Sequence, residues 1–486
     1  MGFRGRSIRI RAAVAAGLLL AALALLTVIP IAGLSNSAGQ KSLFSAVLNA
    51  ATSATSLDRK PAATATRGTF TGVASCAGTT CHGRMEADGK VVRQDELQRW
   101  QEPSTQGGAH SRAFAVLGGA RSRQIAATLG IGDPTAATEC LGCHATPTSG
   151  PRGDRFLTQD GVGCEACHGP AGGWIASHYA VGASHATNVS NGLVPLDRPA
   201  ARAAVCLDCH FGSDRPGQFV THRIMAAGHP RIAFELDLFS TLQAHHDEDA
   251  DYVSRKGRPD SLRLWAVGQA LALERSLSLY AGARGTEGVF PEFYFLDCHS
   301  CHRRIYDQDS RVKSWEANPG RPIPPGMPPY NDENIIMLSA AAQVAAPALA
   351  ARFESDSRAF HAAMGRDRAS SVAAARRLAA SAAALAAQFA SAPPGGDMAF
   401  AIVERIAGQA IAPRFTDYEG SVQAVMGLDT LLNALVKSGR VTVGAAAGIR
   451  ADINRAYAAV REPNSFRPGD FRMALGSAAR GIGALR

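Results

Sequence analysis

The cysteines constrain the fold of this chain more than any other feature. All ten cysteines of the 486-residue chain fall into five close pairs, and a histidine directly follows each pair. Four pairs have the spacing Cys-x-x-Cys-His, whereas the first, in the sequence SCAGTTCHG, has four residues between its cysteines. The motifs are Cys76–Cys81–His82, Cys140–Cys143–His144, Cys164–Cys167–His168, Cys206–Cys209–His210 and Cys298–Cys301–His302. The chain therefore has to build five similar small sites.

This order of residues is typical of covalent haem attachment. Two thiols add to the two vinyl groups of one haem, and the adjacent histidine then lies beneath the macrocycle as the proximal ligand of the iron. We therefore predict that the ten cysteines attach five haem c groups. The predicted proximal ligands are His82, His144, His168, His210 and His302.

Other uses of paired cysteines explain the pattern less well. Disulfides are the default in an exported chain, and thiol redox centres also use Cys-x-x-Cys, but neither requires a histidine after each pair. A structural zinc site combines two such pairs into one tetrahedron, and five is an odd number. The wider first motif is interpreted as a haem site whose longer turn bulges outward, because the other eight cysteines are all committed to their own pairs.

The nine remaining histidines include candidate ligands for the distal side of each iron, opposite the motif histidine. Electron-transfer haems usually close that side with histidine or methionine. The distal candidates are His110, His178, His185, His222, His229, His245 and His246. Because His222 and His229 are seven residues apart, one face of a helix is expected to present both. His299, inside its own motif, is interpreted as a bystander, and His361, alone in an alanine-rich segment, as a surface residue.

The N-terminal segment predicts export. Arginines in RGRSIRIR precede an apolar run of 23 residues that ends at Leu34, and small polar residues follow. Residues 1–38 are either a signal peptide or a retained membrane anchor, because the run is also long enough to span a bilayer. Positive charge before the run keeps the N-terminus in the cytoplasm. We expect a periplasmic protein, soluble or anchored to the inner membrane, with residues 39–69 as a linker.

The basic charge of the chain does not predict nucleic-acid binding. The formal net charge is +9, but four of the arginines lie in the N-terminal segment, and no Lys/Arg-rich tract follows. Haem propionates would offset the remainder. The expected partners are redox proteins of unspecified identity.

The expected fold is mainly α, with little regular sheet. Residues 70–330 would form a pentahaem domain in which the haems replace most of the hydrophobic core. Helices are predicted to run into the motifs in TAATECLGCHA and RAAVCLDCHF, and an amphipathic helix is predicted in DSLRLWAVGQALALERSLSLYAGA. Residues 331–486 would form an alanine-rich bundle of five or six helices, the first one running unbroken from Asn334 to Met364. This bundle is either a cover for the haem domain or a structural extension.

Parts of the sequence resemble the multihaem cytochromes of the c-554 type. The resemblance lies in GVGCEACHGPAGGWIASH, in GGAHSRAF and in CLDCHFG with THRIMAAGHPR, and covers about residues 70–305. It implies an exported electron-transfer protein whose haems are ligated mostly by two histidines, here the motif histidines with His110, His178, His222 and His229. One haem in that family can be five-coordinate.

Two functions fit these observations. The first is an electron carrier with five closely packed, mostly bis-histidine haems. The alternative is an oxidoreductase that acts on a small nitrogen or sulfur compound at one five-coordinate haem. Its acid–base candidates would be His245, His246, Asp247 and Tyr179, none of which lies in a specific motif. A haem-based sensor or a structural subunit is a third class, with no feature of its own in the sequence.

Overall fold

The computed structural model describes residues 68–85, 94–286, 288–302, 321–324, 327–410 and 418–486. The chain separates into two units, Met1–Pro61 and Ala62–Arg486, and every described residue belongs to the second. The predicted signal or anchor (1–38) and nearly all of the predicted linker (39–69) lie outside the described residues. Within the described part, no helix combines the length and apolar character that crossing a bilayer requires.

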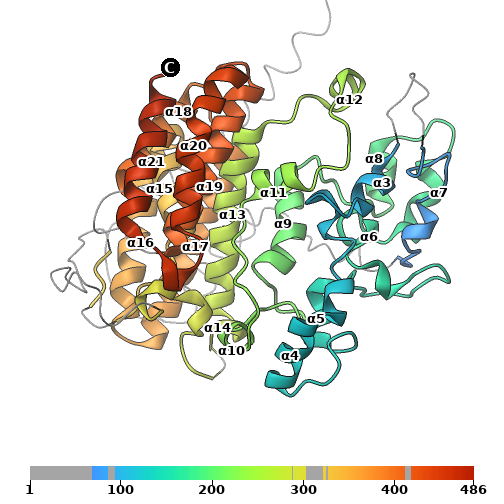
Figure 1. Cartoon of the computed structure of the whole chain (residues 1–486), viewed down its shortest axis with the longest axis horizontal. Coiled ribbons are helices and arrows are strands. Elements are labelled where there is room, and N and C mark those ends of the chain that lie inside the picture. The colour runs from blue at the N-terminus through green and yellow to red at the C-terminus, as the bar shows by residue number, and fades with distance from the viewer. Residues whose placement is uncertain (1–67, 86–93, 287, 303–320, 325–326, 411–417) are drawn as a thin grey trace, which may run out of the picture. The chain divides into compact units, whose positions relative to one another are not determined.

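The fold is mainly helical, as the sequence predicted (Figure 1). The described residues form 19 α-helices and no strand, and 62% of the structure is helical. Extended pairing in the described part is confined to two isolated bridges, Phe70 with Arg152 and Leu296 with Tyr330. Because four of the five cysteine motifs lie within or at the end of short helical segments, the fold consists there of brief helices and long connections.

Short helices make up the first half of the described chain. They are α3 (Glu96–Gln101), α4 (Ala120–Leu129), α5 (Thr138–His144), α6 (Cys164–His168), α7 (Ile175–His178), α8 (His185–Ser190), α9 (Pro199–His210), α10 (His222–Ala226), α11 (Leu236–Leu242) and α12 (Ala250–Lys256). The predicted helices that run into the second and fourth motifs are α5 and α9. The length of these short helices is typical of helices that are stabilised by tertiary contacts, because an isolated helix shorter than about 12–15 residues is marginal in water.

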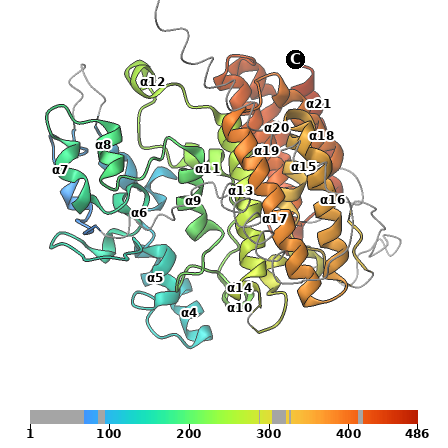
Figure 2. The ribbon, with the colours of Figure 1, turned by 180° about the vertical axis from the view of Figure 1, so that it is seen from behind.

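One long helix, α13 (Ser261–Ala281), joins the two halves of the described chain. Asp260 caps its N-terminus by accepting a hydrogen bond from the Arg263 backbone N–H. The helix packs against α9 and α11 on one side and against helices of the C-terminal half on the other (Figures 1 and 2). This helix was predicted as amphipathic, but it is buried on most of its circumference, with Trp265 and Ala266 fully enclosed. It is therefore a central element and not a surface helix.

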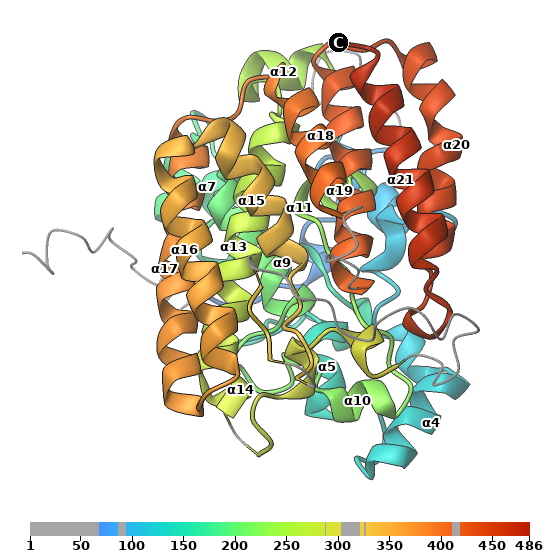
Figure 3. The same ribbon diagram turned by 90° about the vertical axis from the view of Figure 1, so that its left-hand side faces the viewer.

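After the one-turn helix α14 (Ala283–Thr286), seven helices follow in the C-terminal half, where five or six were predicted. They are α15 (Glu333–Ala345), α16 (Pro347–Met364), α17 (Arg368–Ser391), α18 (Met398–Ala410), α19 (Tyr418–Lys437), α20 (Val443–Ala459) and α21 (Pro468–Gly483). Neighbouring long helices lie side by side, as α16 does with α17 and α20 with α21 (Figure 3). The single helix predicted for residues 334–364 is interrupted at Ala346, because Pro347 starts a new helix at its first position.

The hydrophobic core lies mainly in this second half. A large cluster of buried apolar residues begins at Phe219 and extends to Ile482, with most members from α13 and the C-terminal helices. The first half contributes mainly a small cluster of Ala203, Leu207, Phe211, Phe234, Leu236, Leu264 and Ala272. The region around the cysteine motifs therefore has little apolar packing of its own.

His361, predicted at the surface, is fully buried. Its Nε2 lies 2.8 Å from Asp332 Oδ1, its Nδ1 donates to the Ser357 carbonyl at 2.9 Å, and Asp332 also pairs with Arg321. The prediction was wrong because the alanine-rich pattern does not show which face of α16 packs inward. A buried charged group needs such partners, so this cluster fixes α16 against the start of α15.

Candidate haem centres

The backbone of each motif brings its cysteines and its histidine to one side. Helices α5, α6 and α9 each end at the motif histidine, and the fifth motif begins with a 3₁₀ turn over Cys298–Ser300. In a helix, residues three and four positions apart lie on the same face. All ten cysteines are free thiols in the structure, so none is committed to a disulfide.

The wider first motif closes in the same way as a regular one. In the fifth motif, the His302 backbone N–H donates to the carbonyl of Cys298 at 2.7 Å. In the first motif, the His82 N–H donates to the carbonyl of Cys76 at 3.2 Å, although two more residues lie between them. The extra residues form a local turn in which the Cys81 N–H donates to the Gly78 carbonyl at 2.8 Å. The additional length therefore loops out between the two cysteines.

Each of the five motif histidines has a second histidine ring opposite it. The ring centroids are 6.0 Å apart for His82 and His178, 6.3 Å for His110 and His210, 6.3 Å for His144 and His229, 6.3 Å from His168 to both His245 and His246, and 6.1 Å for His222 and His302. Bonds of about 2.0–2.1 Å from one metal to imidazole nitrogens on both sides place two ring centroids roughly 6 Å apart. The five pairs thus have the spacing that two axial ligands of one iron require.

The protonation of the rings suits metal ligation. Burial lowers the pKa of His168 to about 3 and that of His210 to about 4, so both imidazoles are neutral at neutral pH. His144 Nδ1 donates to the Ala113 carbonyl and His229 Nδ1 to the Pro230 carbonyl, each at 2.8 Å. With Nδ1 protonated, Nε2 carries the lone pair that binds a metal. These neighbours hold the rings in the tautomer that a haem iron needs.

His110 is held by a tight backbone approach. It follows the turn Gly107–Ala109, and a Cβ on Gly108 would lie 2.0 Å from the Glu102 carbonyl oxygen, so this position requires glycine. The His110 carbonyl accepts from the Val162 N–H at 3.0 Å. These contacts direct the segment toward the fourth motif, where His110 faces His210.

His178 ends the short helix α7. Its ring makes an edge contact with Trp174, at 5.6 Å between centroids, and its Nδ1 lies 3.5 Å from the side-chain amide of Asn188. The motif histidine that it faces is His82, from the first motif. The helix therefore serves the first site and not the third motif that precedes it in sequence.

His222 and His229 do not share a helix face, contrary to the prediction. Helix α10 ends at Ala226, and Gly228 adopts a φ of 114°, which reverses the chain before His229. His222 faces His302 of the fifth motif, and His229 faces His144 of the second. The segment thus supplies two different sites from its two ends.

His185 has no motif histidine opposite it among the described ring contacts. It begins α8, its side chain is 47% exposed, and its Nε2 lies 3.2 Å from Asp197 Oδ1. The structure gives this candidate an ion pair at the surface. His245 and His246, by contrast, both lie opposite His168, and one ligand atom from each of the three residues falls within 4.8 Å of the others.

Comparison with protein-family models assigns part of this chain. Residues 75–169, which contain the first three motifs, match the family described as cytochrome c554 and c-prime. The match supports a c-type cytochrome of that family, and haem c is the cofactor that the family implies. No curated protein and no solved structure matched the chain.

Contacts between motifs connect the sites. The Cys76 thiol interacts with the Cys164 thiol, which joins the first and third motifs. Helices α6 and α9 are in contact, which joins the third and fourth. Cys143 Sγ lies 4.0 Å from the Cys209 carbonyl oxygen, which joins the second and fourth. The segment that carries His222 and His229 joins the second and fifth.

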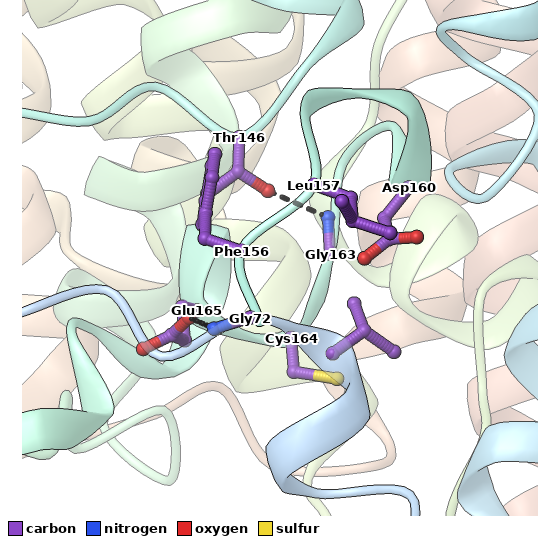
Figure 4. Close-up of a pocket in the computed structure, with 9 residues that line it drawn as sticks. Gly72, Thr146, Phe156, Leu157, Asp160, Gly163, Cys164 and Glu165 are labelled. Atoms are coloured by element: carbon purple, nitrogen blue, oxygen red, sulfur yellow. Dashed lines mark hydrogen bonds between the residues drawn. The ribbon is translucent and has the colours of Figure 1, made fainter. Parts of the chain in front are cut away.

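Glu165, a variable residue of the third motif, anchors the start of the described chain (Figure 4). Its carboxylate accepts the backbone N–H of Gly72 at 2.7 Å. It also accepts the backbone N–H groups of Thr71 at 2.8 Å and of Ala171 at 2.6 Å. Beside it, Thr146 Oγ1 accepts from the Gly163 N–H at 2.9 Å. This role was not predicted from the sequence, because the acid alone does not indicate its remote backbone partners.

The fifth motif is hydrogen-bonded to the C-terminal helices of the chain. Glu419 of α19 accepts the Cys298 N–H at 3.2 Å, and Asp297 accepts the Tyr418 N–H at 2.7 Å. Arg231 Nε lies 3.6 Å from Glu419 Oε1. His299 donates from Nδ1 to the Pro463 carbonyl at 3.0 Å. The C-terminal half thus contacts the start of the fifth motif directly.

Proposed function

We propose that this chain is an exported electron-transfer cytochrome with five haem c groups, each held between two histidines. The main observation in support concerns the motif histidines, which are the proximal ligands by their place in the motif. Each of them has a second histidine ring whose centroid lies 6.0–6.3 Å away. The haem groups supply iron that cycles between the ferrous and ferric states. The cysteines of each motif would hold the cofactor covalently.

The paired rings favour a carrier over the oxidoreductase alternative. Catalysis at a haem requires an open axial position with acid–base groups nearby. Here a histidine faces each of the five motif histidines. Asp247, one acid–base candidate, pairs with Arg99, and Tyr179 is 76% exposed. The protein groups near the sites therefore serve to fill coordination positions.

The contacts between motifs support one order of the redox centres along the protein. We propose first, third, fourth, second, fifth, with the first and fifth sites at the ends of the series. Each neighbouring pair in this order shares a contact between motifs or a connecting segment. Redox partners would then bind near the two end sites. Export to the periplasm, which c-type cytochromes typically share, is part of the same proposal.

Haem content and spin state test the proposal. The pyridine haemochrome assay and the intact mass of the purified protein should both give five covalent haems. EPR of the oxidised protein should show low-spin ferric iron at all of them. A count of four would exclude one motif as an attachment site. A high-spin signal that shifts with nitrite, hydroxylamine or NO would instead support the oxidoreductase.

A further inference from the structure

One carboxylate contacts histidines of two different sites. Glu96 begins α3, and its side chain is only 10% exposed. Its Oε2 lies 3.0 Å from His82 Nδ1, and its Oε1 lies 3.1 Å from His246 Nδ1. His82 belongs to the first motif, and His246 faces His168 of the third. The two oxygens of Glu96 therefore each receive a hydrogen bond from the ring of a candidate iron ligand.

The third site has one distal candidate too many. His245 and His246 lie at the same centroid distance from His168, 6.3 Å, and their planes are inclined to it by 87° and 88°. Their own centroids are 4.3 Å apart, so only one of them can occupy the position opposite His168. Ring distance and angle do not distinguish them.

The Nδ1 partners do distinguish them. His246 donates to the Glu96 carboxylate, whereas His245 Nδ1 lies 3.2 Å from the backbone carbonyl of Gln243. A hydrogen bond to a charged acceptor is about twice as strong as one to a neutral acceptor. A carboxylate behind an imidazole also fixes the ring orientation and makes its other nitrogen a better metal ligand. His246 is therefore the better prepared ligand.

Helix α3 is fastened to both sites, so Glu96 is well placed to act on them. The Leu97 N–H donates to the His82 carbonyl at 3.0 Å, which ties α3 to the first motif. Arg99, one turn further on, forms an ion pair with Asp247, next to His246. Arg99 also pairs with Asp95 at 3.2 Å. The hydrogen bonds of Glu96 to the two rings are thus supported by further contacts between α3 and the same two sites.

We propose that Glu96 is a positioning residue that selects His246 as the distal ligand of the third haem and lowers the potentials of the first and third haems together. This inference rests on the proposed bis-histidine function. A carboxylate that accepts the Nδ1 proton increases electron donation from the ligand and favours the ferric state. Because one carboxylate accepts hydrogen bonds from both His82 and His246, its removal should change the potentials of these two haems alone.

Potentiometry of the full haem-loaded chain tests the shared role through Glu96→Gln. Two of the five midpoint potentials should rise, each by ~59 mV. This shift corresponds to about a tenfold change in the ratio of oxidised to reduced iron for a one-electron couple. Glu96→Asp, which keeps the charge but draws the oxygens back, should raise the same two potentials by less. The matched control is Glu102→Gln, at the other end of α3, whose carboxylate contacts Ser104. It should leave all five potentials unchanged.

EPR of two further variants tests the choice of ligand. His245→Ala should leave the low-spin ferric signals as they are, and His246→Ala should change one of them. The opposite pattern would overturn the selection of His246. Five attached haems with potentials that Glu96→Gln does not move, or with only one that moves, would overturn the shared role and leave the proposed function intact. Absence of haem at the first or third motif in the unaltered protein would instead refute the proposed function.

Discussion

The rings of His82 and His178 lie almost parallel, with planes inclined by 13°, whereas those of His144 and His229 are inclined by 89°. His110 with His210, and both candidates at His168, are also steeply crossed, at 68–88°. The angle between two axial imidazoles sets how unequally they interact with the iron d orbitals. The first site should therefore differ spectroscopically from the second, third and fourth.

Replacing His178 by Ala should open the first site alone. The variant should convert one low-spin ferric haem to high spin, and the EPR signal that disappears should be the more rhombic one, which belongs to a parallel pair. The control is His185→Ala, which removes a nearby histidine that is half exposed and paired with Asp197. It should leave the spectrum unchanged. A high-spin signal in the control variant would mean that His185 is a ligand after all.

The widened first motif should tolerate shortening. Thr79 and Thr80 are exposed in the turn between Cys76 and Cys81, and the bond from the His82 N–H to the Cys76 carbonyl spans that turn. Deletion of both threonines gives a regular Cys-x-x-Cys-His motif, and five covalent haems should remain by intact mass. Cys76→Ala should weaken attachment at this site. Loss of haem in the deletion variant, with Cys76→Ala fully loaded, would contradict the assignment.

The sequence was sufficient to predict the local helices and the candidate ligands of the sites. Helices α5, α9 and α13 were predicted because each has a strong pattern of its own. Six of the seven distal candidates face motif histidines in the structure, namely His110, His178, His222, His229, His245 and His246. Which motif each one faces was not predictable, because that choice is made by reversals such as the one at Gly228. Sequence spacing suggested a helix face that the chain does not form.

The residues missed by the sequence analysis act over long distances in the chain. Glu96, Glu165 and Glu419 each bind backbone or imidazole groups from remote segments. A single acid has no periodicity or motif that would identify such a partner. His361 was misplaced for a related reason, because its burial depends on Asp332 and Arg321 from the preceding connection.

Removal of Glu419 should strongly destabilise the protein. Its side chain is 3% exposed and pairs with Arg231, which is 14% exposed, and it also accepts the Cys298 N–H. Glu419→Ala leaves a buried guanidinium without this partner and should reduce the free energy of unfolding by about 3–5 kcal/mol. Denaturant titration followed by circular dichroism measures it. Asp397→Ala breaks an exposed pair with Arg440 and should cost less than about 1 kcal/mol.

Glu235 should make the protein less stable as the pH rises from mildly acidic to neutral. Burial, with the nearby charge of Asp237, raises the pKa of Glu235 from 4.5 to about 7. Between these values the folded state holds a proton that the unfolded state has released, so the free energy of unfolding falls as pH increases. Above pH 7 both states are ionised and the loss is complete.

Glu235→Gln should remove most of this pH dependence, because the amide stays neutral throughout. The melting temperature of the unaltered protein should fall from pH 5 to pH 7.5 by more than that of the variant. A smaller slope should remain in Glu235→Gln, since burial also raises the pKa of Asp237 to about 6. Glu462→Gln, at an exposed position, is the matched control and should keep the full slope. Equal slopes in all three proteins would show that Glu235 is ionised in the folded state at pH 5, because its carboxylate accepts bonds from Thr430, Asp237 and Leu238.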